Sequence, residues 1–272
     1  MSDYRYSCKN FTYNHLCYKN FNFSGIEPET HDVYELIFVK QGSLSYIIED
    51  KIYTVKDNDM IFTKPGMLHR INFSDNAVYD RYDILFDEKI VFKEIFDKIP
   101  KDTNVFYMKK PKKIEEIFQK MDFYCDNFQE LELENVLTHL IDEIFYNILL
   151  SKEQNYKKLY DSHPIVTKAV HFIEDNLHND LSVDAICDNL FITKSYLNKL
   201  FNRYLKVSPG KYVTTKRLIA AQKEIRNGES PTKVFSKFGF LEYSTFYRNY
   251  KDYFGYSPSE ENDKVIIRQI DG

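Results

Sequence analysis

The chain has 272 residues, of which 43% are hydrophobic and 29% charged, a composition typical of a globular protein and not of a disordered or fibrous one. No stretch reaches the roughly 18 apolar residues of a membrane span, and the N-terminus has no apolar signal region, so we expect a cytoplasmic protein without a membrane partner. The four cysteines (Cys8, Cys17, Cys125 and Cys187) lack metal-binding or paired spacing, and we expect reduced thiols.

The first hundred residues are predicted to form β structure. Short runs rich in Val, Ile, Tyr and Phe are separated by turn signals at 41–42, 49–50, 57–59 and 65–66, and a further run covers 79–86. Many short strands at close spacing are typical of a small barrel or jelly roll. We therefore expect a β domain over residues 1–105.

Two amphipathic helices are predicted next, over 112–128 and 133–153, because apolar residues recur three and four apart. The second helix is apolar on more than one side, at Leu137, Phe145, Leu149 and Leu150 in addition to its main stripe. Such a helix either forms a homodimer seam or packs on the outside of the β domain. We assign residues 106–152 to a helical dimerisation segment and the polar residues 153–163 to a linker.

Residues 164–272 are predicted to be all helical, with segments at 164–177, 182–190, 193–205, 208–227, 230–238 and 242–254. Ser182, Thr193 and Ser230 are N-cap residue types, and Pro231 suits a first helical position. Gly228 is expected to end the long middle helix.

A basic block lies within this acidic chain. Residues 194–251 contain thirteen lysines and arginines against three acids, a local balance of +10, although the whole chain carries −4. Such a block favours a polyanionic partner.

The last two segments are copies of one another at a shift of 49 residues. Leu197, Phe201, Ser208 and Pro209 align with Phe246, Tyr250, Ser257 and Pro258. Each copy predicts a short helix, a tight turn, a second helix and a loop, which together form a helix-turn-helix. In the second copy the turn is Gly239-Phe240, where glycine permits a positive φ and the phenylalanine fills the junction.

The second helix of each copy has two kinds of face. We expect Leu197, Phe201, Tyr204, Phe246, Tyr250 and Tyr253 to point inward. The residues expected to contact base edges are Ser195, Asn198, Lys199, Ser244, Thr245, Tyr247 and Arg248. The residues expected to contact phosphates are Lys194, Asn202, Arg203, Lys211 and Lys251. The two helices would enter successive major grooves about 34 Å apart.

These motifs resemble the AraC family of bacterial transcription regulators, over about 100 residues. The matching stretches are "LSVDAICDNLFITKSYLNKLF", "SPGKYVTTKRLIAAQ" and "GFLEYSTFYRNYKDYFGYSP". The sequence departs at Lys206, where the family has glycine, and at Phe235, where it has a small alanine; these departures imply an altered loop and altered helix packing. The resemblance implies promoter DNA as a partner, a small-molecule effector, a homodimer, contact with RNA polymerase, and activation more often than repression.

In many such regulators the N-terminal part resembles a cupin barrel, and the predicted fold is therefore α+β: a cupin-like barrel with dimerisation helices, then an all-α domain of two helix-turn-helix units joined by a long helix. His31-x3-Glu35-x6-Gly42 and His69 resemble cupin metal motifs, but Glu29 stands where a second histidine would be. We expect His31, Glu35 and His69 to contact a small polar effector, such as a sugar, with no metal or other cofactor. A bound metal and a structural role are the alternatives at these residues.

The sequence thus predicts a DNA-binding transcription regulator that is not an enzyme. Two alternatives stay open: a metal-dependent cupin enzyme fused to a DNA-binding domain, and a regulator without an effector.

Overall fold

The structure, a computed structural model, describes residues 4–8, 10–19, 28–72, 78–100, 103–108, 110–150, 160–178 and 181–263. Its contacts divide the chain into two compact units. The first contains the described parts of 4–48 and 53–160, and the second contains 49–52 and the described parts of 161–264. None of the described helices is long and apolar enough to cross a membrane.

The described strands form two sheets. The larger has the strand order β1 (Tyr4–Ser7), β2 (Phe11–Lys19), β8 (Val78–Phe86), β3 (Tyr34–Gln41), β6 (Asp59–Thr63) and β9 (Val105–Tyr107). The smaller has the order β10 (Tyr160–Asp161), β5 (Lys51–Val55), β4 (Leu44–Ile48) and β7 (His69–Asn72). The α+β class is confirmed, whereas these strand orders describe two sheets and not a closed barrel.

The predicted turns lie between these strands. Gly42, Glu49, Asn58 and Gly66 have φ angles of 146°, 50°, 70° and 79°, which only a turn accommodates readily. β9 falls at the end of the predicted β domain, and most of the predicted linker, 153–159, lies outside the described residues.

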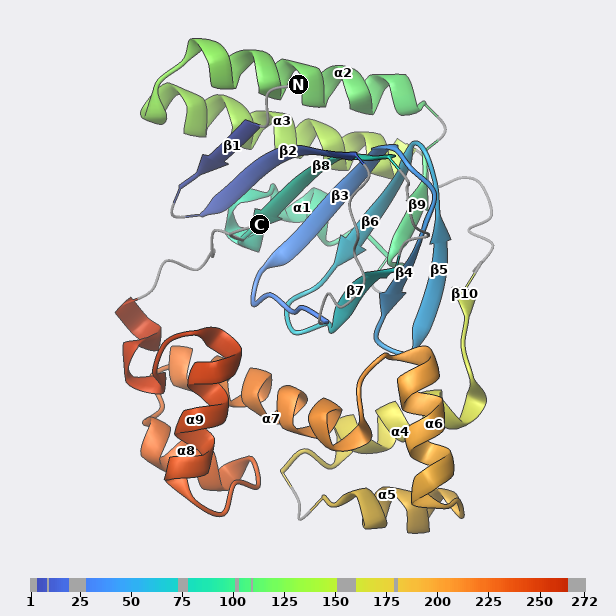
Figure 1. Cartoon of the computed structure of the whole chain (residues 1–272). Coiled ribbons are helices and arrows are strands. Elements are labelled where there is room, and N and C mark those ends of the chain that lie inside the picture. Colours follow the sequence, from blue (N-terminus) through green and yellow to red (C-terminus); the bar gives the residue numbers. More distant parts are fainter. Residues whose placement is uncertain are drawn as a thin grey trace. The chain divides into compact units, whose positions relative to one another are not determined.

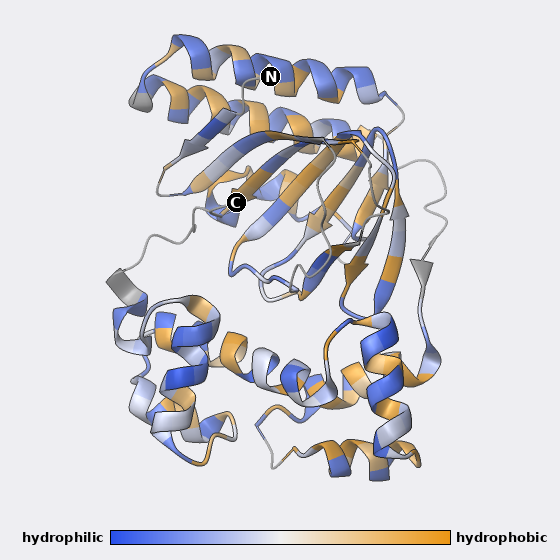
Figure 2. Cartoon of the chain, viewed as in Figure 1, coloured by the Kyte–Doolittle hydropathy of each residue, from blue (hydrophilic) through white to orange (hydrophobic). Residues whose placement is uncertain are grey.

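Side chains alternate across the larger sheet and build two cores. Leu36 and Phe38 of β3 pack toward helices α2 (Pro111–Asn127) and α3 (Glu130–Leu150), which lie side by side on that face (Figure 1). Ile37 and Val39 point the other way and pack with residues of β4 and β5. Figure 2 shows the hydrophobic residues of these helices turned toward the sheet and the hydrophilic ones turned away.

The width of the apolar surface on α3 is explained within the chain. Leu137 and Phe145 are fully buried in the same core as Phe62 and Phe86, beside the short helices η1 (Glu88–Ile90) and α1 (Lys93–Phe96). Leu150, by contrast, is 74% exposed. Packing on the chain's own sheet therefore accounts for most of the surface that suggested a homodimer, and dimerisation stays a prediction.

The second unit is helical, with bounds α4 Pro164–Asp175, α5 Val183–Leu190, α6 Lys194–Tyr204, α7 Pro209–Arg226, α8 Pro231–Lys237, α9 Tyr243–Phe254 and η2 Pro258–Asp263. Ser182 and Thr193 cap α5 and α6 by accepting from the backbone N–H groups of Ala185 and Tyr196. Ser230 is the N-cap residue of α8 as predicted, with Pro231 at the start of the helix, but its hydroxyl lies 2.7 Å from Thr232 Oγ1 and makes no capping hydrogen bond.

Lys206 and Gly255 occupy equivalent positions after α6 and α9. Their φ angles are 60° and 77°, so the first helix-turn-helix keeps the left-handed turn although a lysine stands in the glycine position. The backbone N–H of Lys206 still donates to Phe201 O, at 2.9 Å. The predicted change of loop shape is therefore absent at this turn, and its cost is borne as backbone strain instead.

Replacing Lys206 by glycine should stabilise the second unit by about 0.5–1 kcal/mol, because the relief of left-handed strain exceeds the added freedom of the unfolded chain. Urea unfolding followed by far-ultraviolet circular dichroism measures the difference. The reciprocal change, Gly255→Ala, should destabilise by a similar amount, and equal stability of all three proteins would contradict the strain assignment.

Candidate DNA-binding surface and ligand cluster

Two helix-turn-helix units, α5–α6 and α8–α9, lie at opposite ends of α7 (Figure 1). The turn between α8 and α9 requires glycine: a Cβ on Gly239, whose φ is 70°, would lie 2.6 Å from the guanidinium carbon of Arg217. That guanidinium donates to Gly239 O at 3.3 Å and to Leu181 O at 3.5 Å, so it has little freedom to move. The predicted role of Gly239 is confirmed.

The inward faces of α6 and α9 are largely as predicted. Phe246 and Tyr250 are fully buried. Phe240 fills the turn, and the centroid of its ring lies 5.2 Å from that of Phe246. Tyr253 was assigned inward but is only half-buried, because the buried stripe continues by steps of four to Phe254.

The same correction applies to α6, where Tyr204 is half-buried and Leu200 completes the stripe with Leu197 and Phe201. Phe235, the second departure from the family pattern, lies between α8 and α9, with its ring 5.6 Å from Tyr243 and 6.5 Å from Phe246. The larger side chain is therefore accommodated in the packing of α8 against α9.

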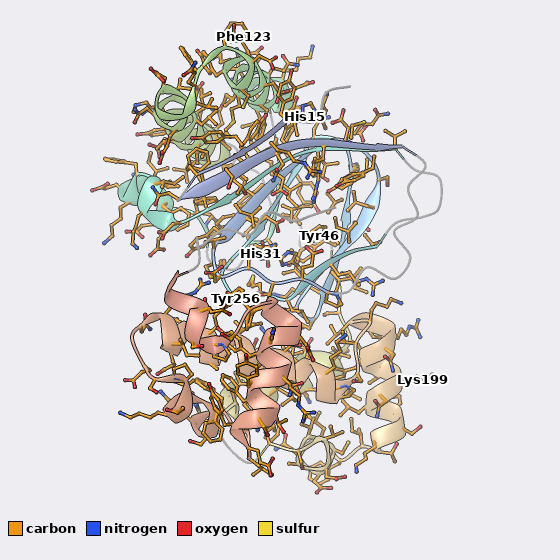
Figure 3. All side chains as sticks on the ribbon, turned by 60° about the vertical axis from the view of Figure 1, so that its left-hand side comes forward. His15, His31, Tyr46, Phe123, Lys199 and Tyr256 are labelled. Atoms are coloured by element: carbon orange, nitrogen blue, oxygen red, sulfur yellow. The ribbon has the colours of Figure 1, made fainter. Side chains whose placement is uncertain are left out.

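The predicted base-contacting residues Ser195, Lys199, Ser244, Thr245, Tyr247 and Arg248 are all exposed. Figure 3 shows Lys199 on the outer side of α6. Asn198 differs: it is half-buried, and its side-chain amide donates to Lys194 O at 2.9 Å on its own helix. An adenine contact by Asn198 would have to replace this bond.

The predicted phosphate-contacting residues Lys194, Asn202, Arg203, Lys211 and Lys251 are also exposed. Lys194 Nζ already lies 2.7 Å from Asp184 Oδ1. Other members of the basic block are neutralised by acids outside it: Lys216 is buried 3.3 Å from Glu174, and Arg226 Nε is paired with the buried carboxylate of Glu261. The field available to a polyanion is therefore weaker than the local count of +10 suggests.

A buried carboxylate that the sequence did not reveal holds the second unit together. Glu261 of η2 is 2% exposed and accepts hydrogen bonds from Tyr250 OH of α9 and Arg226 Nε of α7. Tyr256 OH and Gln222 Nε2 donate to it at 3.2 and 3.3 Å. Glu261 could not be identified from the sequence, because a single acid in a short segment after the repeat belongs to no recognisable spacing pattern.

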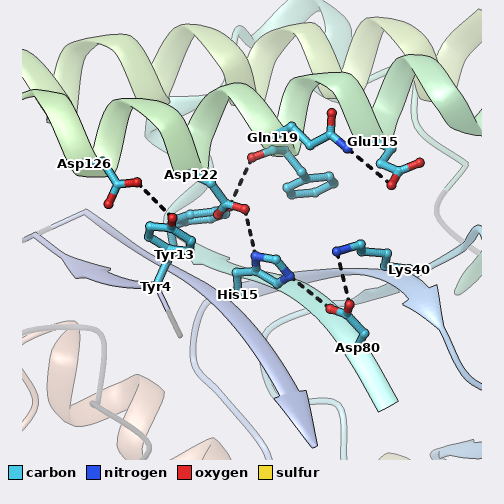
Figure 4. A network of polar contacts seen from close by, with 10 residues as sticks. Tyr4, Tyr13, His15, Lys40, Asp80, Glu115, Gln119, Asp122 and Asp126 are labelled. Atoms are coloured by element: carbon cyan, nitrogen blue, oxygen red, sulfur yellow. Dashed lines mark hydrogen bonds and ion pairs between the residues drawn. The ribbon is translucent and has the colours of Figure 1, made fainter. Parts of the chain in front are cut away.

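A second unforeseen cluster joins α2 to the larger sheet (Figure 4). His15 Nδ1 lies 2.7 Å from Asp122 Oδ2 and its Nε2 lies 2.9 Å from Asp80 Oδ1, while Lys40 Nζ lies 3.1 Å from the other oxygen of Asp80. Tyr13 OH donates to Asp122 at 2.5 Å. Both imidazole nitrogens face carboxylates, so both must donate, and the ring is an imidazolium.

The pKa of His15 follows from this arrangement. Burial alone would lower it, but the hydrogen bonds to Asp122 and Asp80 and their negative charges raise the pKa to about 9. The histidine therefore carries its charge at neutral pH.

The three predicted effector residues come together in the first unit. His69 Nε2 lies 3.1 Å from Glu35 Oε2, and His31 Nε2 lies 3.9 Å from Glu35 Oε1. Burial alone would raise the pKa of Glu35, but attraction to His69, His31 and Arg81 lowers it below its usual range. Burial alone would lower the pKa of His69, but Glu35 raises it to about 9.

Glu29 adjoins this cluster. Its backbone exchanges two hydrogen bonds with that of His69, at 2.8 and 2.9 Å. Among the residues that the structure describes, Glu29, His31 and His69 form the one group of three side chains placed to share a metal ion. The sequence had placed Glu29 in the position of a missing histidine, and the fold brings it to the same cluster.

These features define a protein with a double helix-turn-helix unit and a separate β unit that contains a polar ligand cluster. A family model described as "Helix-turn-helix domain" matches residues 186–263, and one described as "AraC-like ligand binding domain" matches residues 10–121. The chain belongs to the AraC family of transcription regulators, as its sequence motifs indicated.

Three relatives illustrate the similarity. The lactose operon transcription activator of Staphylococcus xylosus is 24% identical over 83% of this chain and 82% of its own length. The transcriptional activator AarP of Providencia stuartii is 30% identical over 35% of this chain and 71% of its own length. The regulator GbdR of Pseudomonas aeruginosa is 28% identical over 49% of this chain, and the match spans only 38% of GbdR.

Proposed function

We propose that this protein regulates transcription by binding promoter DNA through α6 and α9. The observation that supports the proposal is the matched exposure of equivalent residues on the two helices. Ser195, Lys199 and Asn202 of α6 correspond to Ser244, Arg248 and Lys251 of α9, and all six are exposed. A hydroxyl followed by a cation on an exposed helix face suits base edges in the major groove.

The spacing of the two units supports a single face of the duplex as the binding site. The 18 residues of α7 lie between the units and make a helix about 27 Å long at 1.5 Å per residue. Recognition helices attached at its two ends are suited to successive major grooves, which repeat every 34 Å or so.

A pair of substitutions on one helix tests the assignment. Arg248→Ala should weaken binding to the preferred site by about 1–3 kcal/mol and relax the preference at one base pair. Lys251→Ala should weaken binding to all sequences alike and reduce the slope of log K against log salt by about 1.

Selection from a random duplex library with the wild-type protein would supply the preferred site. Fluorescence anisotropy titrations at several salt concentrations then compare the two variants on that site and on single-base variants of it. Unchanged affinity and specificity in Arg248→Ala would show that the face assignment is wrong.

We further propose that the sheets of residues 1–105, as a cupin-like domain, bind a small polar effector at His31, Glu35 and His69. The segment 106–152 would carry a homodimer contact, although the packing of α3 leaves less apolar surface for it than the sequence suggested. Effector binding would shift the population of DNA-binding-competent dimers, which act from the cytoplasm on RNA polymerase, as activators. In this reading the chain is a regulator and not an enzyme.

A further inference from the structure

The cluster of Glu29, His31 and His69 has the dimensions of a metal site. One ligand atom of each residue lies within 4.8 Å of those of the other two. Ligands about 2.1 Å from a tetrahedral ion are separated by roughly 3.4 Å, so these side chains need to close by up to about 1.4 Å. The two imidazole rings are already 5.0 Å apart at their centroids.

His69 is oriented as metal-bound histidines are. Its Nδ1 lies 2.9 Å from the backbone oxygen of Met67, and because a carbonyl only accepts, Nδ1 carries the proton and donates. Such a bond on one ring nitrogen fixes the ring and leaves the other nitrogen for an ion, which takes the place of the proton on Nε2 that the ion pair with Glu35 stabilises. Nε2 faces Glu35 at 3.1 Å, in an ion pair that lacks hydrogen-bond geometry among the described residues.

The remaining groups supply charge and rigidity. Glu35 is 3% exposed, its Oε2 accepts from Thr63 Oγ1 at 3.0 Å, and it lies within 4 Å of both imidazoles. The two backbone hydrogen bonds between Glu29 and His69 fix those two residues relative to one another. Glu29 itself is exposed, which gives an ion a path from solvent.

We infer that Glu29, His31 and His69, with Glu35 beside them, bind one divalent transition-metal ion. Two imidazole nitrogens favour zinc, manganese, iron, cobalt or nickel over magnesium and calcium, which prefer oxygen ligands alone. The charge of the ion balances the two carboxylates in a partly buried site. The inference names the ligand class of the proposed effector site, and only its regulatory consequence rests on the proposed function.

Cobalt(II) is a suitable probe because its visible absorption reports nitrogen and oxygen ligation directly. Metal-stripped full-length protein is dialysed against Co²⁺ or Zn²⁺, and the bound metal is measured by elemental analysis. We expect one ion per chain in the wild type. Glu29→Gln and His31→Gln should each raise the dissociation constant at least 10-fold, and each should change the cobalt spectrum.

His139→Gln is the matched control, because His139 is an exposed histidine of α3 in the same unit. It should bind metal as the wild type does. Glu29 contributes only its backbone to the strand pairing described above, so Glu29→Gln should fold even if a histidine variant does not. Absence of stoichiometric metal in the wild type, or its full retention in both variants, would overturn the inference.

DNA binding is measured in the same preparations without metal. A loss of DNA binding there bears on the proposed function alone, whereas a loss of metal binding with DNA binding intact bears on the metal site alone.

Discussion

Replacing Glu261 by alanine should destabilise the helical unit by about 3–5 kcal/mol, because it leaves the half-buried Arg226 and the buried phenol of Tyr250 without their common acceptor. Burial and the nearby carboxylate raise the pKa of Tyr250, so the phenol remains a donor. Glu261→Gln should also destabilise, because an amide presents one oxygen and two donors to a set of donors.

Urea unfolding followed by far-ultraviolet circular dichroism measures this loss, since the chain has no tryptophan. Glu229→Gln is the matched control: Glu229 is an exposed acid of the same helical unit, and its replacement should cost less than about 1 kcal/mol. A cycle with Arg226→Ala should be strongly non-additive, because each single change already removes the shared contact. A cost below about 1 kcal/mol for Glu261→Ala would show that the carboxylate does not hold α7 and α9 together.

Raising the pH from 6 to 9.5 should remove about 3 kcal/mol of stability that depends on His15. The folded pKa of about 9 exceeds the unfolded value of 6.5, so the stabilisation is fully present below pH 6.5 and is lost as the pH rises through 9. The charged groups that face the ring are Asp122, which accepts from Tyr13, on one side and Asp80, which is paired with Lys40, on the other, and the rings of Tyr82 and Tyr4 lie beside it.

The measurement compares the wild type with His15→Gln at both pH values. The gap between their free energies of unfolding should shrink by about 3 kcal/mol from pH 6 to pH 9.5. The difference between two proteins is needed because His69, which also has a raised pKa, contributes in the same direction to both. A gap for His15→Gln that stays constant with pH would refute the imidazolium assignment.

The helical unit was largely predictable because its sequence is periodic and duplicated. The steps of three and four identified Leu197, Phe201, Phe246 and Tyr250 as inward residues, and the repeat placed Gly239 in a turn. Tyr253 was misassigned because the buried stripe of α9 runs in steps of four through Phe246, Tyr250 and Phe254, which leaves Tyr253 at its edge.

The β unit was less predictable because its contacts join residues distant in sequence. Short alternating runs indicate strands, but they do not fix which strands pair, and the pairing of β2 with β8 is what brings His15 next to Asp80. Likewise Glu29 and His69 meet only through a backbone bridge between distant segments. His31 and Glu35, four residues apart on one stretch of chain, were recognisable together from spacing alone.

On α9 the residues that anchor the helix and those that face outward do not overlap. Phe246, Tyr250 and Phe254 are enclosed by the unit, while Ser244, Thr245, Tyr247 and Arg248 are exposed. Substitutions at the outer positions therefore carry little folding penalty. On the proposed DNA contact, such changes can alter the preferred operator without disturbing the packing that holds the helix in place.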